Sequence, residues 1–169
     1  MRYLAAFGPA TVSDMARWSR LSGLAEVVSR IRHRLTVFRD ERGRELFDLP
    51  AAPRPDPETP APVRFLPEYD NVLLSHADRS RFGAPDGIVV SVDRPFKGSV
   101  LVEGQVRAIW HFARQGRGKT AERVALVVDH LPLDGPQVAA VEAEADDLLR
   151  FWHADVADRT VQLRPFERD

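Results

Sequence analysis

The segment PAAPRPDPETPAPV, residues 50–63, places the strongest constraint on how this chain can fold. It contains six prolines in fourteen positions. Proline has no backbone N–H and a fixed φ angle, so such a run forms neither a helix nor a central β-strand. It favours a stiff, extended linker instead. We therefore expect this linker to separate one domain, residues 1–49, from a second, residues 64–169.

Three short helices are expected within the first domain. The first, Tyr3–Phe7, ends where a Gly-Pro pair interrupts it. The second begins at Thr11, a residue type that caps helix N-termini, and Asp14 follows three positions later, as in a capping box. A Ser-Gly break precedes the third, whose apolar residues recur at the period of a helix: Leu24, Val27, Val28, Ile31 and Leu35.

A β-hairpin is expected directly after the third helix. The segment LTVFRDERGRELFDLP, residues 35–50, has two alternating apolar runs around a turn that contains Gly43. Three helices followed at once by a hairpin are typical of a winged helix-turn-helix, in which the hairpin is the wing. In this motif the outer face of the third helix enters the DNA major groove.

Arginines on such surfaces bind phosphates and guanine edges. The candidate DNA-binding residues of the first domain are Arg30, His33 and Arg34 on the third helix, with Arg42 and Arg44 at the wing tip. A solvated helix face, or a module that contacts another protein, is the alternative interpretation of the same residues.

In the second domain, apolar and polar residues alternate as they do in β-strands. Gly87–Val92 alternates weakly, GSVLVEGQVRAIWHF predicts a hairpin that turns at Glu103-Gly104, and RVALVVDHL and RTVQLRPF predict two more strands. One helix is expected between the last two strands, with Asp134 as its N-cap. Its buried stripe should consist of Val138, Val141, Ala145, Leu148, Leu149 and Trp152. The expected fold class is α+β: a winged helix-turn-helix followed by a β-rich, barrel-like lobe with one C-terminal helix.

The loop ARQGRGKTAER, between two of these strands, is basic. It carries Arg114, Arg117, Lys119 and Arg123 against one acid, Glu122. Its glycines let the backbone follow a phosphate chain, so Arg114, Arg117 and Lys119 are further candidate DNA-binding residues. The letters GRGKT match the end of a nucleotide-binding P-loop, but Ala113 replaces the first glycine and a strand follows instead of a helix. No cofactor is therefore expected.

Residues 64–82, RFLPEYDNVLLSHADRSRF, gather acids, arginines and a histidine around an apolar run. One histidine with two acids is a weak ligand set, so no metal site is expected. Asp70 and His76 are the candidate catalytic residues, with Asp70 or Glu68 as a general base and His76 as its partner. The alternative is that the acids and arginines pair with each other where the linker meets the second domain.

The charge of the chain is unevenly distributed. The net charge is -1, yet residues 1–50 hold nine arginines against six acids (+3), and the remainder holds fifteen basic against nineteen acidic residues (-4). The basic half is where an anionic partner is expected. No apolar run approaches the ~20 residues that span a membrane, and the sequence shows no signal peptide. The sequence contains no cysteine, which fits a cytoplasmic location.

In their order, these features resemble the C-terminal part of winged-helix DNA-binding proteins related to bacterial interstrand-crosslink-repair DNA glycosylases. The matching segments are FGPATVSDMARWSRL, FDLP, RFLPEYDNVLLSHADRSR, GSVLVEGQVRAIWHF and VEAEADDLLRFW. The resemblance implies double-stranded DNA as the partner, and in the glycosylase members the removal of alkylated or crosslinked bases. There a Gln-x-Gln or Gln-x-Asp motif of an N-terminal winged helix carries the chemistry. The glutamines here, Gln105, Gln115, Gln137 and Gln162, form no such motif, so the chain is either a short or truncated member of the family or not a glycosylase.

Three functions remain open from the sequence. The first is duplex DNA binding linked to repair of alkylated or crosslinked DNA, without glycosylase activity of this chain. The second is a non-catalytic regulatory module with a protein partner. The third is an active DNA glycosylase that uses Asp70 or Glu68. The sequence does not determine the oligomeric state.

Overall fold

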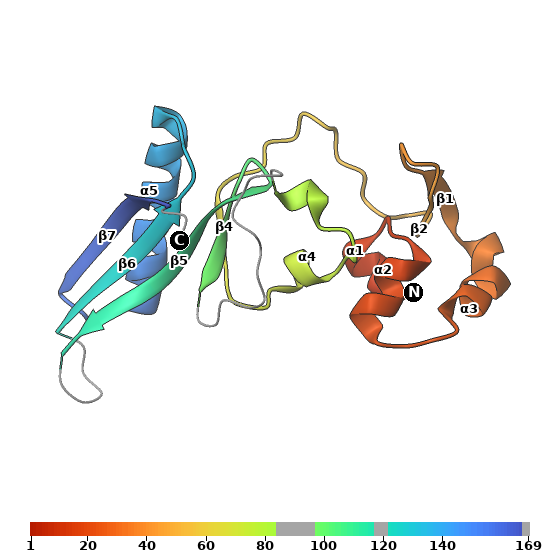
Figure 1. Ribbon diagram of the computed structural model, residues 1–169, viewed down its shortest axis with the longest axis horizontal. Coiled ribbons are helices and arrows are strands. Elements are labelled where there is room, and N and C mark those ends of the chain that lie inside the picture. Colours follow the sequence, from red (N-terminus) through yellow and green to blue (C-terminus); the bar gives the residue numbers. More distant parts are fainter. Residues whose placement is uncertain (84–96, 117–121, 167–169) are drawn as a thin grey trace. The chain divides into compact units, whose positions relative to one another are not determined.

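The computed structural model of the protein describes residues 1–83, 97–116 and 122–166 (Figure 1). Contacts between residues divide the chain into two compact units. The N-terminal unit consists of Met1–Thr59 and Asn71–Arg79, and the C-terminal unit of Pro60–Asp70 and Ser80–Asp169. The strand predicted at Gly87–Val92 lies outside the described residues. No helix in the described ranges has both the length and the apolar character that crossing a bilayer requires.

The N-terminal unit contains helices and one hairpin. Its elements are α1 (Arg2–Phe7), α2 (Val12–Ser19), α3 (Leu24–Ile31), the 3-10 helix η1 (Arg32–Arg34), β1 (Thr36–Arg39), β2 (Glu45–Asp48) and α4 (Asn71–Leu74). β1 and β2 pair antiparallel, and Gly43 in their turn has a φ of 76°, which only glycine adopts without strain. An isolated bridge between Ala10 and Phe47 joins this hairpin to the helices. The buried core consists of Leu4, Ala10, Met15, Val28 and Phe47.

The predicted capping box at the start of α2 is confirmed. The Thr11 hydroxyl accepts from the backbone N–H of Asp14 at 3.1 Å. The Asp14 carboxylate accepts from the Thr11 backbone N–H at 2.8 Å and from its hydroxyl at 2.7 Å. These bonds satisfy donors that the first turn of a helix leaves without partners.

The third helix is shorter than its apolar period predicts. It ends at Ile31, and η1 turns the chain into β1. Val27, expected in the buried stripe, is 49% exposed, because only Val28 of this two-turn helix is fully buried against the core.

The C-terminal unit is a five-stranded sheet with one long helix. Its elements are β3 (Arg64–Leu66), the 3-10 helix η2 (Ser80–Phe82), β4 (Gly98–Val102), β5 (Gln105–Gln115), β6 (Arg123–His130), α5 (Gly135–Trp152) and β7 (Asp158–Pro165). The strand order is β3-β4-β5-β6-β7, and only the β6–β7 pair is parallel. The α+β class is thus confirmed.

The barrel-like shape expected from the sequence is wrong for the described residues. β3 and β7 lie at opposite edges of the sheet, so it is open. The physical reason is the β6-α5-β7 connection, since parallel neighbours need a crossover and a helix provides it. The result is a helix packed on a sheet (Figure 1).

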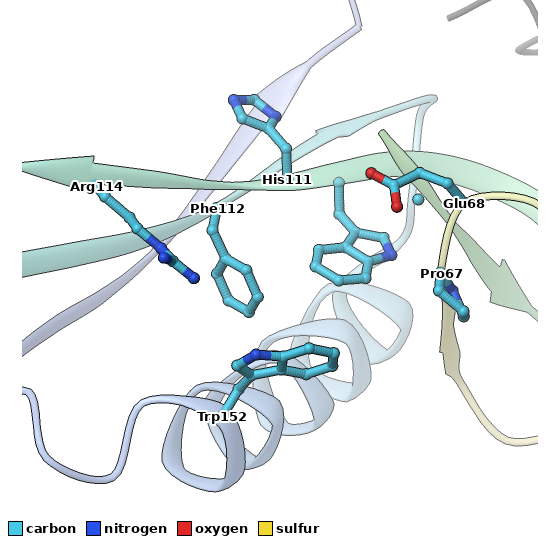
Figure 2. Close-up of a pocket in the computed structure, with 8 residues that line it drawn as sticks. Pro67, Glu68, His111, Phe112, Arg114 and Trp152 are labelled. Atoms are coloured by element: carbon cyan, nitrogen blue, oxygen red, sulfur yellow. The ribbon is translucent and has the colours of Figure 1, made fainter. Parts of the chain in front are cut away.

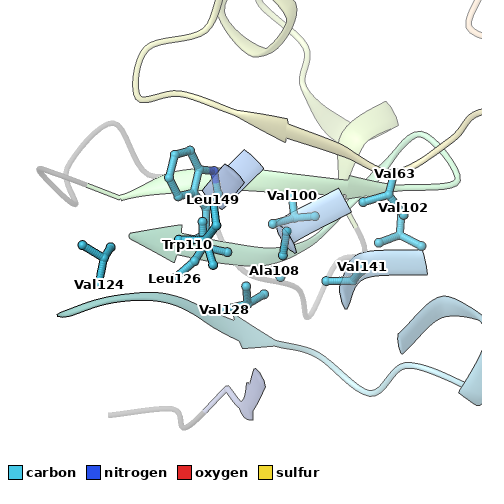
Figure 3. Packing of buried hydrophobic residues seen from close by; sticks show 11 residues of the cluster. Val63, Val100, Val102, Ala108, Trp110, Val124, Leu126, Val128, Val141 and Leu149 are labelled. Carbon is cyan, nitrogen blue, oxygen red and sulfur yellow. The ribbon is translucent and has the colours of Figure 1, made fainter. Parts of the chain in front are cut away.

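The core of the C-terminal unit lies between α5 and the sheet. Val141, Ala145 and Leu149 of α5 are fully buried, as the predicted stripe requires. They pack in one cluster with residues of three strands and the preceding linker: Val63, Val100, Val102, Ala108, Trp110, Val124, Leu126 and Val128 (Figure 3). The expected N-cap is also present, because Asp134 accepts from the N–H of Gln137 at 2.8 Å.

The prediction that Trp152 belongs to the buried stripe of α5 is wrong. It occupies the last position of α5 and is 57% exposed. The final turn of α5 extends beyond the fully buried part of the cluster. The Trp152 indole therefore contacts the core on one side only.

Candidate nucleic-acid interface

The basic residues expected on the third helix lie at its C-terminal end. Arg30 is in the last turn of α3, whereas His33 and Arg34 are on η1, and all three are exposed. Positive charge is favourable where helical carbonyls end. Arg30 forms an ion pair with Glu26, one turn earlier, between two exposed side chains. Such a pair contributes little to stability, so a phosphate can replace the carboxylate.

The two arginines at the hairpin tip contact acids of the same unit. Arg44 donates its Nε to Asp40 Oδ2 at 2.6 Å. Arg42 and Arg44 both reach Asp78 Oδ2, at 3.2 and 3.3 Å. The hydrogen bond from Arg44 holds the pKa of Asp40 below its ordinary value, and the same bond raises the pKa of Arg44. The charge of this tip is therefore largely balanced within the N-terminal unit.

The basic loop of the C-terminal unit is described at its two ends. Arg114 is exposed near the end of β5. Arg123 begins β6 and pairs with Asp158 at 2.5 Å. Arg117 and Lys119 lie outside the described residues. The structure therefore places Arg114 on the strand that leads into this loop.

Asp70 and His76, the candidate catalytic residues, belong to different compact units. His76 is 6% exposed, and its Nδ1 lies 2.7 Å from the Ser75 hydroxyl. Asp70 is half-buried. Burial of this degree favours a stabilising role for the His76 ring, and its part in chemistry stays a prediction.

A pocket of about 170 Å³ opens beside β5 in the C-terminal unit (Figure 2). Its lining comes from the two residues that follow β3, the start of β4, the second half of β5 and the last turn of α5: Pro67, Glu68, Gly98, Trp110, His111, Phe112, Arg114 and Trp152. The last residue pair between β4 and β5 is Gly98 and Trp110, so the pocket lies where β5 continues beyond its neighbour.

Aromatic rings form much of the pocket. Trp110 and Phe112 meet edge to face at 5.3 Å between ring centroids, and Phe112 lies 6.0 Å from Trp152. Trp110 is fixed by a hydrogen bond from its Nε1 to the Leu66 carbonyl at 3.0 Å. Gly98 leaves room for this indole, because a Cβ there would lie 2.3 Å from Trp110 Nε1.

Two histidines near the pocket have a pKa below the ordinary value of 6.5. Burial lowers the pKa of His111, and the charge of Lys97 lowers it further. Burial also lowers the pKa of His153, with the charge of Arg114 adding to the effect. Arg114 and Trp152, the last residue of α5, both line the pocket.

Sequence reasoning singled out Glu68 and Arg114 but missed their aromatic neighbours. The alternation of the hairpin indicates a strand position for Trp110, the helical period indicates a buried position for Trp152, and neither pattern singles out Phe112. The available indication was the pair Phe151-Trp152 at a helix end, where two adjacent aromatic residues cannot both face the core. In the described ranges, no group of three or more His, Cys, Asp or Glu side chains is placed to hold a metal ion.

Comparison with known proteins identifies one family. The family described as DNA glycosylase AlkZ-like matches residues 1–151. No curated protein and no solved structure matches the chain.

Proposed function

Because the chain belongs to the DNA glycosylase AlkZ-like family, we propose that it binds double-stranded DNA in the repair of alkylated or crosslinked bases. The observation that carries the proposal is the exposed basic group at the end of α3: Arg30, His33 and Arg34. It follows two short helices and directly precedes a hairpin, the order that a winged helix-turn-helix requires.

In this proposal, residues 1–49 form the winged helix and the β1–β2 hairpin is its wing. Residues 50–63 are the linker, and residues 64–169 form a second lobe. The end of α3 lies in or against the major groove, and phosphates compete with Glu26 for Arg30. Arg114, Arg117 and Lys119 add a second contact to the DNA backbone. The lack of cysteine supports a cytoplasmic setting.

A measurement of affinity against salt concentration tests the proposal. Labelled duplex DNA is titrated with the chain, and the dissociation constant is read from fluorescence anisotropy between 50 and 200 mM salt, roughly the range over which phosphate contacts respond strongly. If Arg30 and Arg34 contact phosphates, log K should fall with log salt with a slope of about −2, and more steeply if the basic loop also binds. Absence of binding at the lowest salt contradicts the proposal.

The hairpin tip favours a second candidate, a protein-interaction module. Arg42 and Arg44 are balanced by Asp40 and Asp78, which lowers the attraction of this tip to a polyanion. The tip is therefore the part of the N-terminal unit that fits a protein partner best.

A glycosylase that uses Asp70 or Glu68 is the third candidate, and the carboxylate of Glu68 in the aromatic pocket is the observation that keeps it open.

A further inference from the structure

Aromatic side chains held in fixed positions form one wall of the pocket beside β5. The Nε1 edge of Trp110 is anchored by its hydrogen bond to the Leu66 carbonyl and lies close to the backbone of Gly98. Phe112 stands edge-on to it, so neither ring turns freely. Trp152 lies opposite Phe112 in the pocket, with its ring tilted 57° to that of Phe112 (Figure 2). More than half of Trp152 is exposed, which leaves an indole surface available for a planar ligand.

Polar side chains of opposite charge stand at the two ends of this wall. Figure 2 shows Glu68 at one end and Arg114 at the other, with Phe112 and Trp152 between them. The structure gives neither charge an ion pair with a described residue. A ligand that satisfies both ends has an N–H donor for the carboxylate, a planar middle for the rings and a negative group for the guanidinium. A nucleotide has these three parts in this order: base edge, ring and phosphate.

The size of the pocket limits the ligand to one ring system. About 170 Å³ is well below the ~300–1,000 Å³ of sites for drug-sized ligands and cofactors. One base of a DNA strand can enter only if it is unpaired, because a paired base has its faces covered by its neighbours. Aromatic side chains at protein surfaces bind unpaired bases by stacking.

We propose that Trp152, Phe112 and Glu68 form a stacking site for a single unpaired base of the bound DNA. This inference rests on the proposed function, and it adds the feature of the DNA that the C-terminal unit recognises. Glu68 accepts a hydrogen bond from an N–H on the exposed edge of the base, such as the amino group of adenine. Arg114 binds the phosphate beside the base.

The test compares two duplexes that differ only in one bulged adenine. We expect the full chain to bind the bulged duplex roughly tenfold more tightly, from stacking on one indole. Trp152→Ala should reduce this ratio to about one without changing the affinity for the paired duplex, whereas Trp152→Phe should keep most of it. Phe151→Ala is the matched control: Phe151 is adjacent, 83% exposed and outside the pocket lining, so the ratio should stay as in the wild type.

A second comparison tests the role assigned to Glu68. Glu68→Ala should weaken binding of the bulged-adenine duplex about fivefold and leave unchanged a duplex whose bulged base is unsubstituted purine, which lacks the amino group. Equal effects on both bases would remove the hydrogen bond from the proposal.

Different outcomes contradict the stacking site and the proposed function. A wild-type ratio of one, with salt-dependent binding of paired duplex retained, overturns the stacking site and leaves the proposed function intact. If paired duplex does not bind, the proposed function fails. The stacking site is then tested by the fluorescence quenching of 2-aminopurine in a short single strand. Equal quenching by wild type and Trp152→Ala overturns the stacking site.

Discussion

The carboxylate of Asp14 accepts a hydrogen bond from the backbone N–H of Ala77 at 2.8 Å, across 63 residues of sequence. Its other oxygen accepts from the backbone and hydroxyl of Thr11. One buried side chain, 5% exposed, thus caps α2 and attaches the segment Asn71–Arg79 to the N-terminal unit. This explains why a segment that follows the linker in sequence packs with helices that precede it.

Replacement of Asp14 by alanine should destabilise the N-terminal unit by about 2–3 kcal/mol. The loss of the cap costs about 1 kcal/mol, and the buried Ala77 N–H left without a partner costs about 1–2 kcal/mol more. Thermal or urea unfolding followed by circular dichroism measures the change. Glu26→Ala, which removes an exposed acid from the next helix, should change stability by less than about 0.5 kcal/mol and serves as the control.

The Asp14 contribution should disappear in acid. Burial alone raises the pKa of Asp14, but its hydrogen bonds from Thr11 and Ala77 outweigh burial and hold the pKa below the ordinary value of 3.8. A group whose pKa is lower in the folded state stabilises that state above its unfolded pKa and loses the effect as pH falls through the folded value. The stability difference between wild type and Asp14→Ala should therefore be constant from pH 7 to about pH 5 and shrink below about pH 4. A difference that grows with acidity would contradict the structure.

Local sequence patterns predicted local structure well, and long-range packing poorly. The Thr11 and Asp134 caps and the hairpin turns at Gly43 and Gly104 depend on residues a few positions apart, and the structure has all of them. The open sheet was missed because strand pairing depends on which strands α5 connects, and apolar alternation does not encode partners. The pocket was missed for the same reason: its residues come from β4, β5, α5 and the segment after β3, between positions 67 and 152.

Gly98→Ala should disrupt both the C-terminal unit and its pocket. The new Cβ would lie 2.3 Å from Trp110 Nε1 and 2.4 Å from the Leu66 carbonyl, so the hydrogen bond between these two groups has to break. Overpacking of this kind costs about 1–3 kcal/mol. The measurement is the unfolding midpoint together with tryptophan emission. Gly135→Ala is the matched control because a Cβ there meets no atom within 4 Å, and it should leave both readouts unchanged.

Changes at the Arg30–Glu26 pair should alter DNA affinity in opposite directions. Glu26→Gln removes the acid that holds Arg30 and should tighten duplex binding roughly two- to fivefold at low salt. Arg30→Ala should weaken binding and reduce the salt slope by about one, the signature of a lost phosphate contact. If both variants bind like the wild type, α3 does not face the DNA and the protein-interaction alternative gains support.

Asp78→Asn separates the two interpretations of the hairpin tip. Asp78 contacts both Arg42 and Arg44, so the neutral amide releases positive charge at the tip. If the hairpin acts as a wing on DNA, duplex affinity should rise, and the gain should vanish near 200 mM salt, roughly where exposed charges are screened. Unchanged affinity at all salt concentrations would exclude the tip from the DNA interface. Asp147→Asn, on the exposed acidic face of α5, controls for the change in net charge.

Asp70→Asn tests whether this chain breaks glycosidic bonds. The proposed function assigns DNA binding alone to the chain, so incubation with alkylated duplex DNA should form no abasic sites, assayed as strand breaks after alkali treatment. If the wild type forms abasic sites, a fall of at least about 100-fold in their rate of formation in Asp70→Asn or Glu68→Gln would identify the carboxylate that acts as general base. General acid–base catalysis contributes about 10²–10⁴-fold. His76→Gln distinguishes the role of the buried ring: activity lost together with stability indicates support of the Asn71–Arg79 segment, whereas activity lost with unchanged stability places His76 in the chemistry.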